Sequence, residues 1–207
     1  MVKVLIHCPV AILHDESYKS ILELDKEGLY IDIFFTFFNP YPPNYKEGIE
    51  TNKLWGFNLV YKLNKAKDMV LKRGYDFLFN VEHDIVLPKH ALKTLLKYAS
   101  SNNVVAGLYR QRRLRDPEKH LCFLIKDEDG NIKWPDESIK KEKIIKNVYI
   151  IPFGCTLFGR EVLEQINFEI GLDAAFAQKA EEFGIERIVV TDVVCGHVDR
   201  DSVIYYP

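Results

Sequence analysis

The sequence predicts an α/β protein: a mixed, mostly parallel central sheet flanked by helices. Through about the first 110 residues, short β-branched or aromatic runs alternate with longer amphipathic segments, which is the pattern of strands joined by helices. Beyond that point the alternation stops, and Asp129-Gly130 marks a hairpin turn between two apolar runs. A hairpin brings antiparallel pairing, so we expect the sheet to be mixed.

In the first half, apolar patterns and helix stop signals predict each element. Strands are expected at residues 2–8, 29–38, 75–81 and 104–109. Helices are expected at 17–27, closed by Gly28, at 52–73, closed by Gly74, and at 91–99, with Pro88 in the first turn. Residues 39–44 contain three prolines and are predicted to form a loop.

In the second half, the hairpin strands fall at 121–125 and 132–134, and a further strand at 144–152. Helices are predicted at 160–165 and 172–183, followed by Gly184 and a last strand at 188–194. A chain of 207 residues with 47% apolar residues can bury one core, so residues 1–207 are expected to form a single domain.

The overall composition excludes some classes of partner. A formal net charge of −2 gives no positive field for nucleic acid or an anionic membrane. No stretch approaches the ~20 apolar residues of a membrane helix, and the N-terminus lacks a secretory signal. We therefore expect a soluble, cytoplasmic protein. Its four cysteines are too scattered for a Cys-x-x-Cys site and are expected to be free thiols.

Charge appears where the apolar strand 75–81 ends, at Glu82-His83-Asp84. Ligands of open α/β sheets bind beyond the carboxyl ends of the strands. Two carboxylates one residue apart suit a hard cation such as Mg²⁺ or Mn²⁺, which keeps positions open for water and phosphate. The same two carboxylates could instead cap the next helix or face solvent.

Five segments, in order, resemble the GT-A glycosyltransferases of the inverting, family-2-like type. Residues 75–88 resemble their Asp-x-Asp strand, and residues 104–113 their following strand, with Gly107-Leu-Tyr109-Arg110. Residues 152–162, 172–180 and 195–197 are similar to the acceptor-side segment, the helix that begins at the catalytic acid, and a terminal Cys-Gly-His. The resemblance covers roughly residues 60 to 200. It implies a GT-A fold, with a nucleotide-binding half at 1–110 and an acceptor-side half at 111–207.

The resemblance also implies a divalent cation, Mn²⁺ or Mg²⁺, and a nucleotide-sugar donor. Asp84 would be the direct metal ligand, Glu82 would address metal or ribose, and His197 would complete the ligands. The residues implied for donor binding are Pro9, Asn64, Glu82, His83 and Asp84. His197 could instead be a hydrogen-bonded residue at a strand end, and Cys195 beside it is better explained as a core thiol.

Asp173 matches the catalytic carboxylate of the family, the general base that deprotonates the acceptor hydroxyl, which implies inversion. A helix N-terminal aspartate stabilised by the macrodipole is the competing explanation. Two residues depart from the family pattern: Leu172 replaces a glutamate, and Glu82 replaces an aspartate.

The segment 110–115 supplies further candidates. Arg110, Arg112, Arg113 and Arg115, together with Gly154, could contact donor phosphate or an acceptor, although such a charge run is often a solvated loop. Tyr109 and Trp134 could stack on a sugar or a base, or could simply pack.

The sequence thus predicts transfer of a sugar from a nucleoside diphosphate donor to a glycan, lipid or protein hydroxyl. Two alternatives remain at this point. A degenerate, non-catalytic GT-A nucleotide- or glycan-binding protein would explain Leu172 and Glu82. A metal-dependent nucleotidyltransferase could use the same carboxylates, but residues 7–10 contain no Gly-rich phosphate loop.

Overall fold

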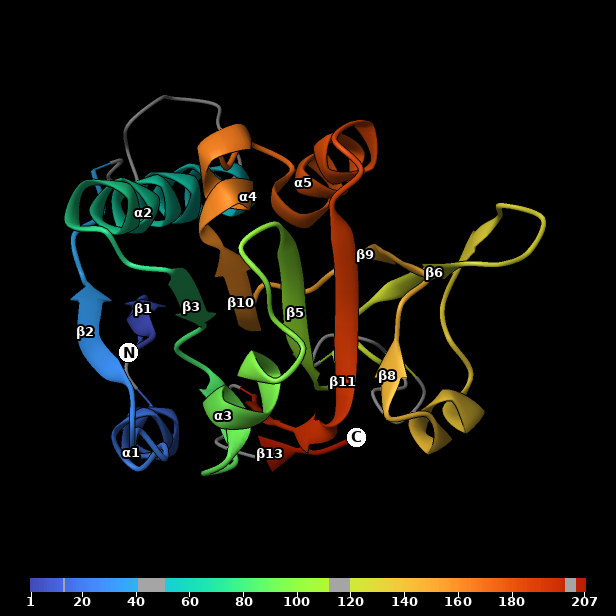
Figure 1. Cartoon of the computed structure of the whole chain (residues 1–207), viewed down its shortest axis with the longest axis horizontal. Coiled ribbons are helices and arrows are strands. Elements are labelled where there is room, and N and C mark those ends of the chain that lie inside the picture. The colour runs from blue at the N-terminus through green and yellow to red at the C-terminus, as the bar shows by residue number, and fades with distance from the viewer. Residues whose placement is uncertain (13, 41–50, 112–119, 200–203) are drawn as a thin grey trace.

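A seven-stranded sheet forms the centre of the molecule (Figure 1). The computed structural model describes residues 1–12, 14–40, 51–111, 120–199 and 204–207. The strand order is β2-β1-β3-β10-β5-β11-β8. Their bounds are β1 Lys3–Pro9, β2 Tyr30–Thr36, β3 Phe77–Val81, β5 Asn103–Leu108, β8 Ile144–Ile145, β10 Cys155–Gly159 and β11 Glu186–Val194.

Strand directions confirm the predicted mixed sheet. β1 pairs in parallel with β2 and β3, and β11 pairs in parallel with β5. β10 is antiparallel to both β3 and β5, and β8 is antiparallel to β11. Five of the seven strands therefore run in one direction, and β10 reverses the chain in the middle of the sheet.

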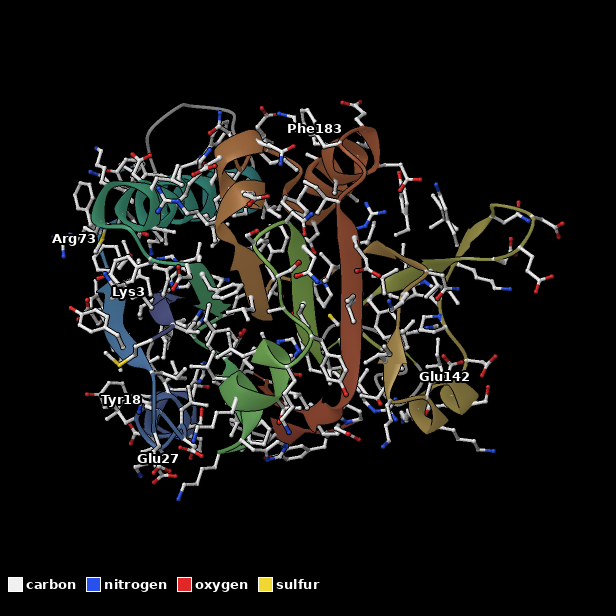
Figure 2. All side chains as sticks on the ribbon, in the orientation of Figure 1. Lys3, Tyr18, Glu27, Arg73, Glu142 and Phe183 are labelled. Carbon is white, nitrogen blue, oxygen red and sulfur yellow. The ribbon has the colours of Figure 1, made fainter. Side chains whose placement is uncertain are left out.

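Helices cover both faces of this sheet, because side chains alternate along each strand. Leu5 and Leu78 pack in the core beneath α2 and α4, whereas Ile6 and Phe79 pack toward α1 and α3. Figure 2 shows the same division, with labelled Arg73 and Phe183 on one side and Tyr18 and Glu27 on the other. The helices are α1 Asp15–Leu22, α2 Thr51–Arg73, α3 Ala91–Leu96, α4 Arg160–Gln165 and α5 Leu172–Glu182. Among the described residues, no helix has the length and apolarity to cross a membrane.

Two small three-stranded sheets flank the main one. One has the order β13-β12-β4, and the other β7-β6-β9, whose hairpin projects beside β8 in Figure 1. Gly130, at φ +82°, forms the predicted hairpin turn. The strands of these two sheets are β4 Ile85–Val86, β6 Leu124–Lys126, β7 Ile132–Lys133, β9 Val148–Ile150, β12 Gly196–Val198 and β13 Ile204–Tyr205. A 3₁₀ turn, η1, spans Glu137–Lys141.

Several predicted boundaries were wrong. The first helix ends at Leu22 and not at 27, because the Asp25 N–H leaves the helix to donate to the Lys89 carbonyl at 2.9 Å. The third helix stops at Leu96, and Pro88 lies before its first turn. The run 144–152 divides into β8 and β9, which belong to different sheets. Strand β10 was missed, and β12 and β13 follow the strand predicted to be last. In the predicted loop, residues 41–44 lie outside the described ranges.

One edge of the sheet collects the predicted site residues. β1, β3, β5 and β11 run the same way, so the residues after Pro9, Val81, Leu108 and Val194 leave the sheet at a common edge. The antiparallel β10 enters the sheet at that same edge, directly after Gly154. This is the position where open α/β sheets bind ligands.

Candidate functional site

The turn that follows β3 presents the predicted carboxylates. All five residues of β3 are buried, so the chain can carry charge only after it leaves the sheet. The Glu82 N–H donates to the Gly154 carbonyl at 2.9 Å, and the Ile85 N–H donates to the Glu82 carbonyl at 3.1 Å. These two hydrogen bonds fix a tight turn that holds Glu82, His83 and Asp84 beyond the strand end.

Backbone pairing brings His197 to Asp84. β12 pairs with β4, with His197 opposite Ile85, and the Val198 N–H donates to the Asp84 carbonyl at 2.8 Å. The His197 Nε2 and Asp84 Oδ2 atoms lie 3.6 Å apart, and their side chains are 9% and 3% exposed. The structure therefore unites two residues predicted as metal ligands, although they are far apart in the sequence.

A backbone carbonyl sets the orientation of the His197 ring. Nδ1 lies 2.6 Å from the carbonyl oxygen of Arg110, which can only accept, so Nδ1 carries the hydrogen. In the neutral imidazole, the lone pair is then on Nε2, the atom that faces Asp84. Metal-ligating histidines are commonly held in this way, with the other ring nitrogen donating to a carbonyl or carboxylate.

Tyr109 contacts the His197 ring, and Gly154 in turn hydrogen-bonds Tyr109. The Tyr109 ring is 3% exposed and meets His197 edge to face, with centroids 5.4 Å apart at 89°. Its hydroxyl accepts the Gly154 N–H at 2.8 Å. A Cβ at residue 154 would lie 2.5 Å from that hydroxyl oxygen, so only glycine fits. Tyr109 is thus too buried to stack on a sugar, as one sequence interpretation suggested, and packs instead.

The carboxylate of Asp173 lies in the same electrostatic neighbourhood as Glu82 and Asp84. Burial is the main cause that raises the pKa of the Cys122 thiol, and the charges of Glu82, Asp173 and Asp84 raise it further. Burial likewise raises the pKa of Tyr109, with added contributions from Glu82 and Asp173. Carboxylates from two segments, the turn after β3 and the start of α5, therefore act on the same buried thiol.

A strained turn delivers Asp173 to the start of α5. Gly171 has φ +99° and Leu172 φ +41°, and Asp173 follows in the first helical turn. A non-glycine residue in this left-handed conformation costs about 1–2 kcal/mol. Leu172 also packs against the core, in the position where the family pattern has an acid. The half-buried Asp173 carboxyl has a raised pKa, caused by burial, which makes it a stronger base.

Asp173 opens into a cavity of about 240 Å³. Cys122 also lines this cavity, and the charges of Glu82, Asp173 and Asp84 act on its thiol. The cavity therefore lies close to these carboxylates. Trp134, 39% exposed, stands at its rim and meets His120 at a ring distance of 5.3 Å. The remaining lining residues are Gln111, Phe123, Leu124, Ile150, Gly171 and Ala174.

Other predicted donor residues have different surroundings. The amide of Asn64 is bonded at both ends to the backbone of Phe168, at 2.8 and 3.1 Å, and not to any predicted site residue. Pro9 is buried at the end of β1, opposite Thr36. His83 stacks on His14 at the start of α1, with ring centroids 5.9 Å apart.

The predicted arginines and Cys195 also lie in different surroundings. Arg110 Nε donates to the Tyr206 carbonyl at 2.9 Å, and its Nη1 lies 3.3 Å from Glu137. Arg112, Arg113 and Arg115 lie outside the described residues. Cys195 is fully buried, as expected for a core thiol, and the four cysteines are free, as predicted.

The donor atoms at Asp84 and His197 are of the kind that Mn²⁺ and Mg²⁺ accept, a carboxylate oxygen and a neutral imidazole nitrogen. Two ligands about 2.1 Å from one ion, at a right angle, lie roughly 3 Å apart. The observed separation of 3.6 Å is of similar size. Within the described ranges, no three His, Cys, Asp or Glu side chains form a preassembled metal cluster. A cation held by Asp84 and His197 would therefore take its remaining ligands from water, from the diphosphate or from Glu82 after a side-chain movement.

A buried cation beside the site was missed in the sequence. Lys62 of α2 is 3% exposed and donates to the Val10 carbonyl at 2.7 Å. Burial lowers the pKa of Lys62. Burial is also the main cause that lowers the pKa of His7 and raises that of Cys8, and the nearby Lys62 charge has a smaller, lowering effect on both. The signal was present in the sequence, because residue 62 falls at helical spacing within the apolar face formed by Leu59 and Leu63.

Comparison with known proteins identifies the fold. No protein-family model matches the sequence, and no curated protein resembles it. The structure of A197 from STIV matches with a TM-score of 0.61 at 17% identity, covering 100% of this chain and 94% of that one. GalNAc-T7, solved with UDP, GalNAc and Mn²⁺, matches with a TM-score of 0.62 at 13% identity. That match covers 96% of this chain but 44% of GalNAc-T7. The chain therefore has a GT-A-like fold, a mixed α/β domain.

Proposed function

We propose that this protein is a metal-dependent glycosyltransferase that moves a sugar from a nucleoside diphosphate donor to an acceptor hydroxyl. One observation carries the proposal: Asp84 and His197 meet at the sheet edge, with 3.6 Å between Oδ2 and Nε2. The charges of Asp84, Glu82 and Asp173 all raise the pKa of the Cys122 thiol, which is consistent with a common site. The fold shared with GalNAc-T7, which was solved with UDP and Mn²⁺, supports the same conclusion.

The donor side consists of the turn after β3 and its neighbours. Asp84 Oδ2 and His197 Nε2 would hold Mn²⁺ or Mg²⁺, and Glu82 would reach the same ion or the ribose. Bound there, the cation would neutralise charge on the departing diphosphate. Pro9 and His83 border this edge and would contact the nucleotide. The Arg110 carbonyl fixes the His197 tautomer, so Nε2 is available without a change of ring orientation.

The acceptor side consists of Asp173 and its cavity. The acceptor oxygen forms a bond to the anomeric carbon as the bond from that carbon to the diphosphate oxygen breaks, and the electron pair leaves with the nucleoside diphosphate. Asp173 takes the proton of the acceptor hydroxyl. Attack opposite the leaving group inverts the anomeric configuration. Burial of the Asp173 carboxyl raises its pKa, which favours this role.

A degenerate, non-catalytic binding protein is the second candidate. Leu172 stands where the family has an acid, and its partly buried side chain packs against the core. Such a protein would bind nucleotide and cation without consuming the donor. Release of free sugar or transfer product from the donor separates the two candidates.

Thermal unfolding tests the proposal. Wild type, Asp84→Asn and the exposed control Asp192→Asn are melted with UDP, GDP, CDP or dTDP, with and without Mn²⁺. A ligand at 100 times its dissociation constant stabilises the folded state by about 2.7 kcal/mol. We expect one nucleotide to raise the midpoint only with Mn²⁺, in wild type and the control but not in Asp84→Asn. If no nucleoside diphosphate stabilises the wild type under either condition, the proposal is wrong.

A further inference from the structure

Two cavities meet at Trp134. The first is the cavity of about 240 Å³ that contains Asp173. The second, of about 670 Å³, lies between the β6–β7 hairpin and η1, and Trp134 lines it as well. Ligand pockets commonly range from about 300 to 1,000 Å³. Together, the two cavities offer room for a ligand longer than one small ring, with Trp134 between its two parts.

The first cavity has a mostly apolar wall. Phe123, Leu124 and Ile150 line it, with Gln111 as a neutral hydrogen-bonding group and Asp173 as its carboxylate. An uncompensated charge on a ligand would be poorly solvated there. A hydroxyl group can instead donate to Asp173 while the rest of its ring contacts apolar side chains.

The second cavity is rich in hydrogen-bond acceptors. Among the described residues, its lining contains one ammonium group, on Lys133, and five carboxylates, on Asp127, Glu128, Asp129, Asp136 and Glu142, the last labelled in Figure 2. Ionised carboxylates only accept hydrogen bonds. A ligand must therefore donate, as hydroxyl or ammonium groups do, whereas the oxygens of a phosphate or sulfate would meet like charge.

Part of this acidic lining is already neutralised or bonded. Asp127 lies 3.3 Å from Lys133 and accepts backbone N–H groups of Asp129 and Asn131. Asp136 accepts the Ser138 N–H at 2.8 Å. These contacts reduce the attraction of the cavity for a cation but leave its acceptor character in place.

We propose that the acceptor of this enzyme is an uncharged saccharide that lies across Trp134, with its reactive hydroxyl at Asp173 and its next residue in the acidic cavity. This inference rests on the proposed function. Trp134 is 39% exposed, and its indole ring would contact the apolar face of a sugar ring. An ammonium group in the first cavity would form an ion pair with Asp173 and occupy the general base, so an uncharged sugar suits transfer there. The acidic second cavity disfavours phosphorylated or sulfated acceptors.

Fluorescence of Trp134 gives a direct test. The chain has two tryptophans, so Trp55→Phe leaves Trp134 as the only reporter. The wild type is first screened on an array of neutral, phosphorylated and amino saccharides. The neutral oligosaccharides that bind are then titrated into the single-tryptophan protein. We expect neutral saccharides to change Trp134 emission, and their phosphorylated counterparts to bind at least about tenfold more weakly.

Two variants examine the stacking contact. Both variants lack the Trp134 reporter, so their binding is measured on the saccharide array. Trp134→Ala should weaken saccharide binding at least about tenfold, whereas Trp134→Phe, which keeps an aromatic ring, should retain most of it. Equal binding by Trp134→Ala and wild type would overturn the inference. Preferential binding of amino sugars or phosphorylated sugars would overturn it too, as would the absence of any neutral ligand on the array.

Nucleotide binding by the same variants keeps this test separate from the proposed function. Trp134→Ala should retain the Mn²⁺-dependent nucleotide shift, because Trp134 lies on the acceptor side. Loss of saccharide binding with that shift intact supports the inference. A wild type that binds nucleotide with Mn²⁺ but no saccharide overturns the inference alone. A wild type that binds neutral saccharide through Trp134 but no nucleotide leaves the cavity assignment standing and overturns the proposed glycosyltransferase.

Discussion

The two sides of the candidate site are held in different ways. Asp84 and His197 are almost fully buried, and backbone pairing between β4 and β12 fixes their approach. Asp173 and Trp134 are partly exposed, and they rest on a strained turn and on a projecting hairpin. The donor side is therefore set by the sheet, whereas the acceptor side is set by local turns.

This difference suggests a division of labour. A cation and a charged diphosphate require ligands that do not reorganise, which a paired and buried edge provides. An acceptor must enter and leave, which a partly exposed cavity permits. Substitutions on the donor side should therefore affect catalysis and folding together, whereas those on the acceptor side should affect catalysis alone.

The largest effect is expected at Asp84. Asp84→Asn should reduce donor turnover by at least about 10³-fold, because it removes a charged cation ligand from a buried site. Release of nucleoside diphosphate measures this rate. Asp192→Asn, at an exposed carboxylate, should match the wild type. Turnover of Asp84→Asn within tenfold of the wild type would contradict the assignment of Asp84.

Asp173→Asn should reduce transfer by about 10²–10⁴-fold, the range for loss of a general base, without changing donor binding or the unfolding midpoint appreciably. Burial raises the pKa of Asp173, so wild-type kcat/KM should fall as pH decreases through that raised value and the carboxylate becomes protonated. The residual rate of Asp173→Asn should lack this acid limb. An unchanged pH profile in the variant would assign the base elsewhere.

The dependence of stability on pH tests the burial of His7 in β1, the strand that ends at Pro9. Burial is the main cause that lowers the pKa of His7 to about 4 from 6.5, and the ring bonds Asn80 and Thr36 at 2.9 Å each. The folded state therefore stays unprotonated where the unfolded chain binds a proton, and stability is lost as pH falls from 6.5 toward 4. The shift corresponds to about 3 kcal/mol.

His7→Gln removes this titration. The stability advantage of the wild type over His7→Gln, measured by urea unfolding, should shrink by about 3 kcal/mol between pH 7 and pH 4. His90→Gln, at an exposed histidine, serves as the control and should follow the wild type. Parallel curves for wild type and His7→Gln would show that burial does not hold His7 unprotonated in the folded state.

The smallest effect is expected at Gly154. Gly154→Ala would place a Cβ 2.5 Å from the Tyr109 hydroxyl, so the folded state should lose about 1–3 kcal/mol through overpacking. Gly56→Ala is the matched control, because a Cβ there meets nothing within 4 Å and the helix should gain about 0.5–1 kcal/mol. Equal unfolding midpoints for Gly154→Ala and the wild type would mean that Tyr109 is not fixed as described.

Sequence patterns were informative where burial enforces a regular pattern. Strand β3 is buried throughout and is apolar except for Asn80, because both its faces are covered, and the first charged residues of this segment follow directly at its end. Gly74 is predicted to end the helix 52–73, and it has the left-handed φ of +70° that is common for a glycine directly after a helix. The convergence of Asp84 and His197 was implied only by the resemblance, because the pairing of β4 with β12 joins strands of two and three residues.

Other features depend on tertiary contacts that leave little local signal. Strand β10 is five residues long, lies between a glycine-containing turn and α4, and runs against its neighbours, so the strand-helix alternation does not predict it. Leu172 adopts φ +41°, a conformation that leucine rarely has, because the turn from Gly171 and the core require it. The cavity that contains Asp173 and Trp134 likewise results from packing between the hairpin and α5, so no single segment of the sequence encodes it.

The most direct test of the account is whether Asp84 and His197 act on one cation. Calorimetry would measure Mn²⁺ binding in the presence of the stabilising nucleoside diphosphate, for wild type, Asp84→Asn, His197→Gln and the double variant. Ligands of one ion are expected to be strongly non-additive. The account predicts that each single variant loses at least about tenfold in affinity and that the double variant is no weaker than the worse single one. Unchanged Mn²⁺ affinity in either single variant, or losses that simply add, would contradict it.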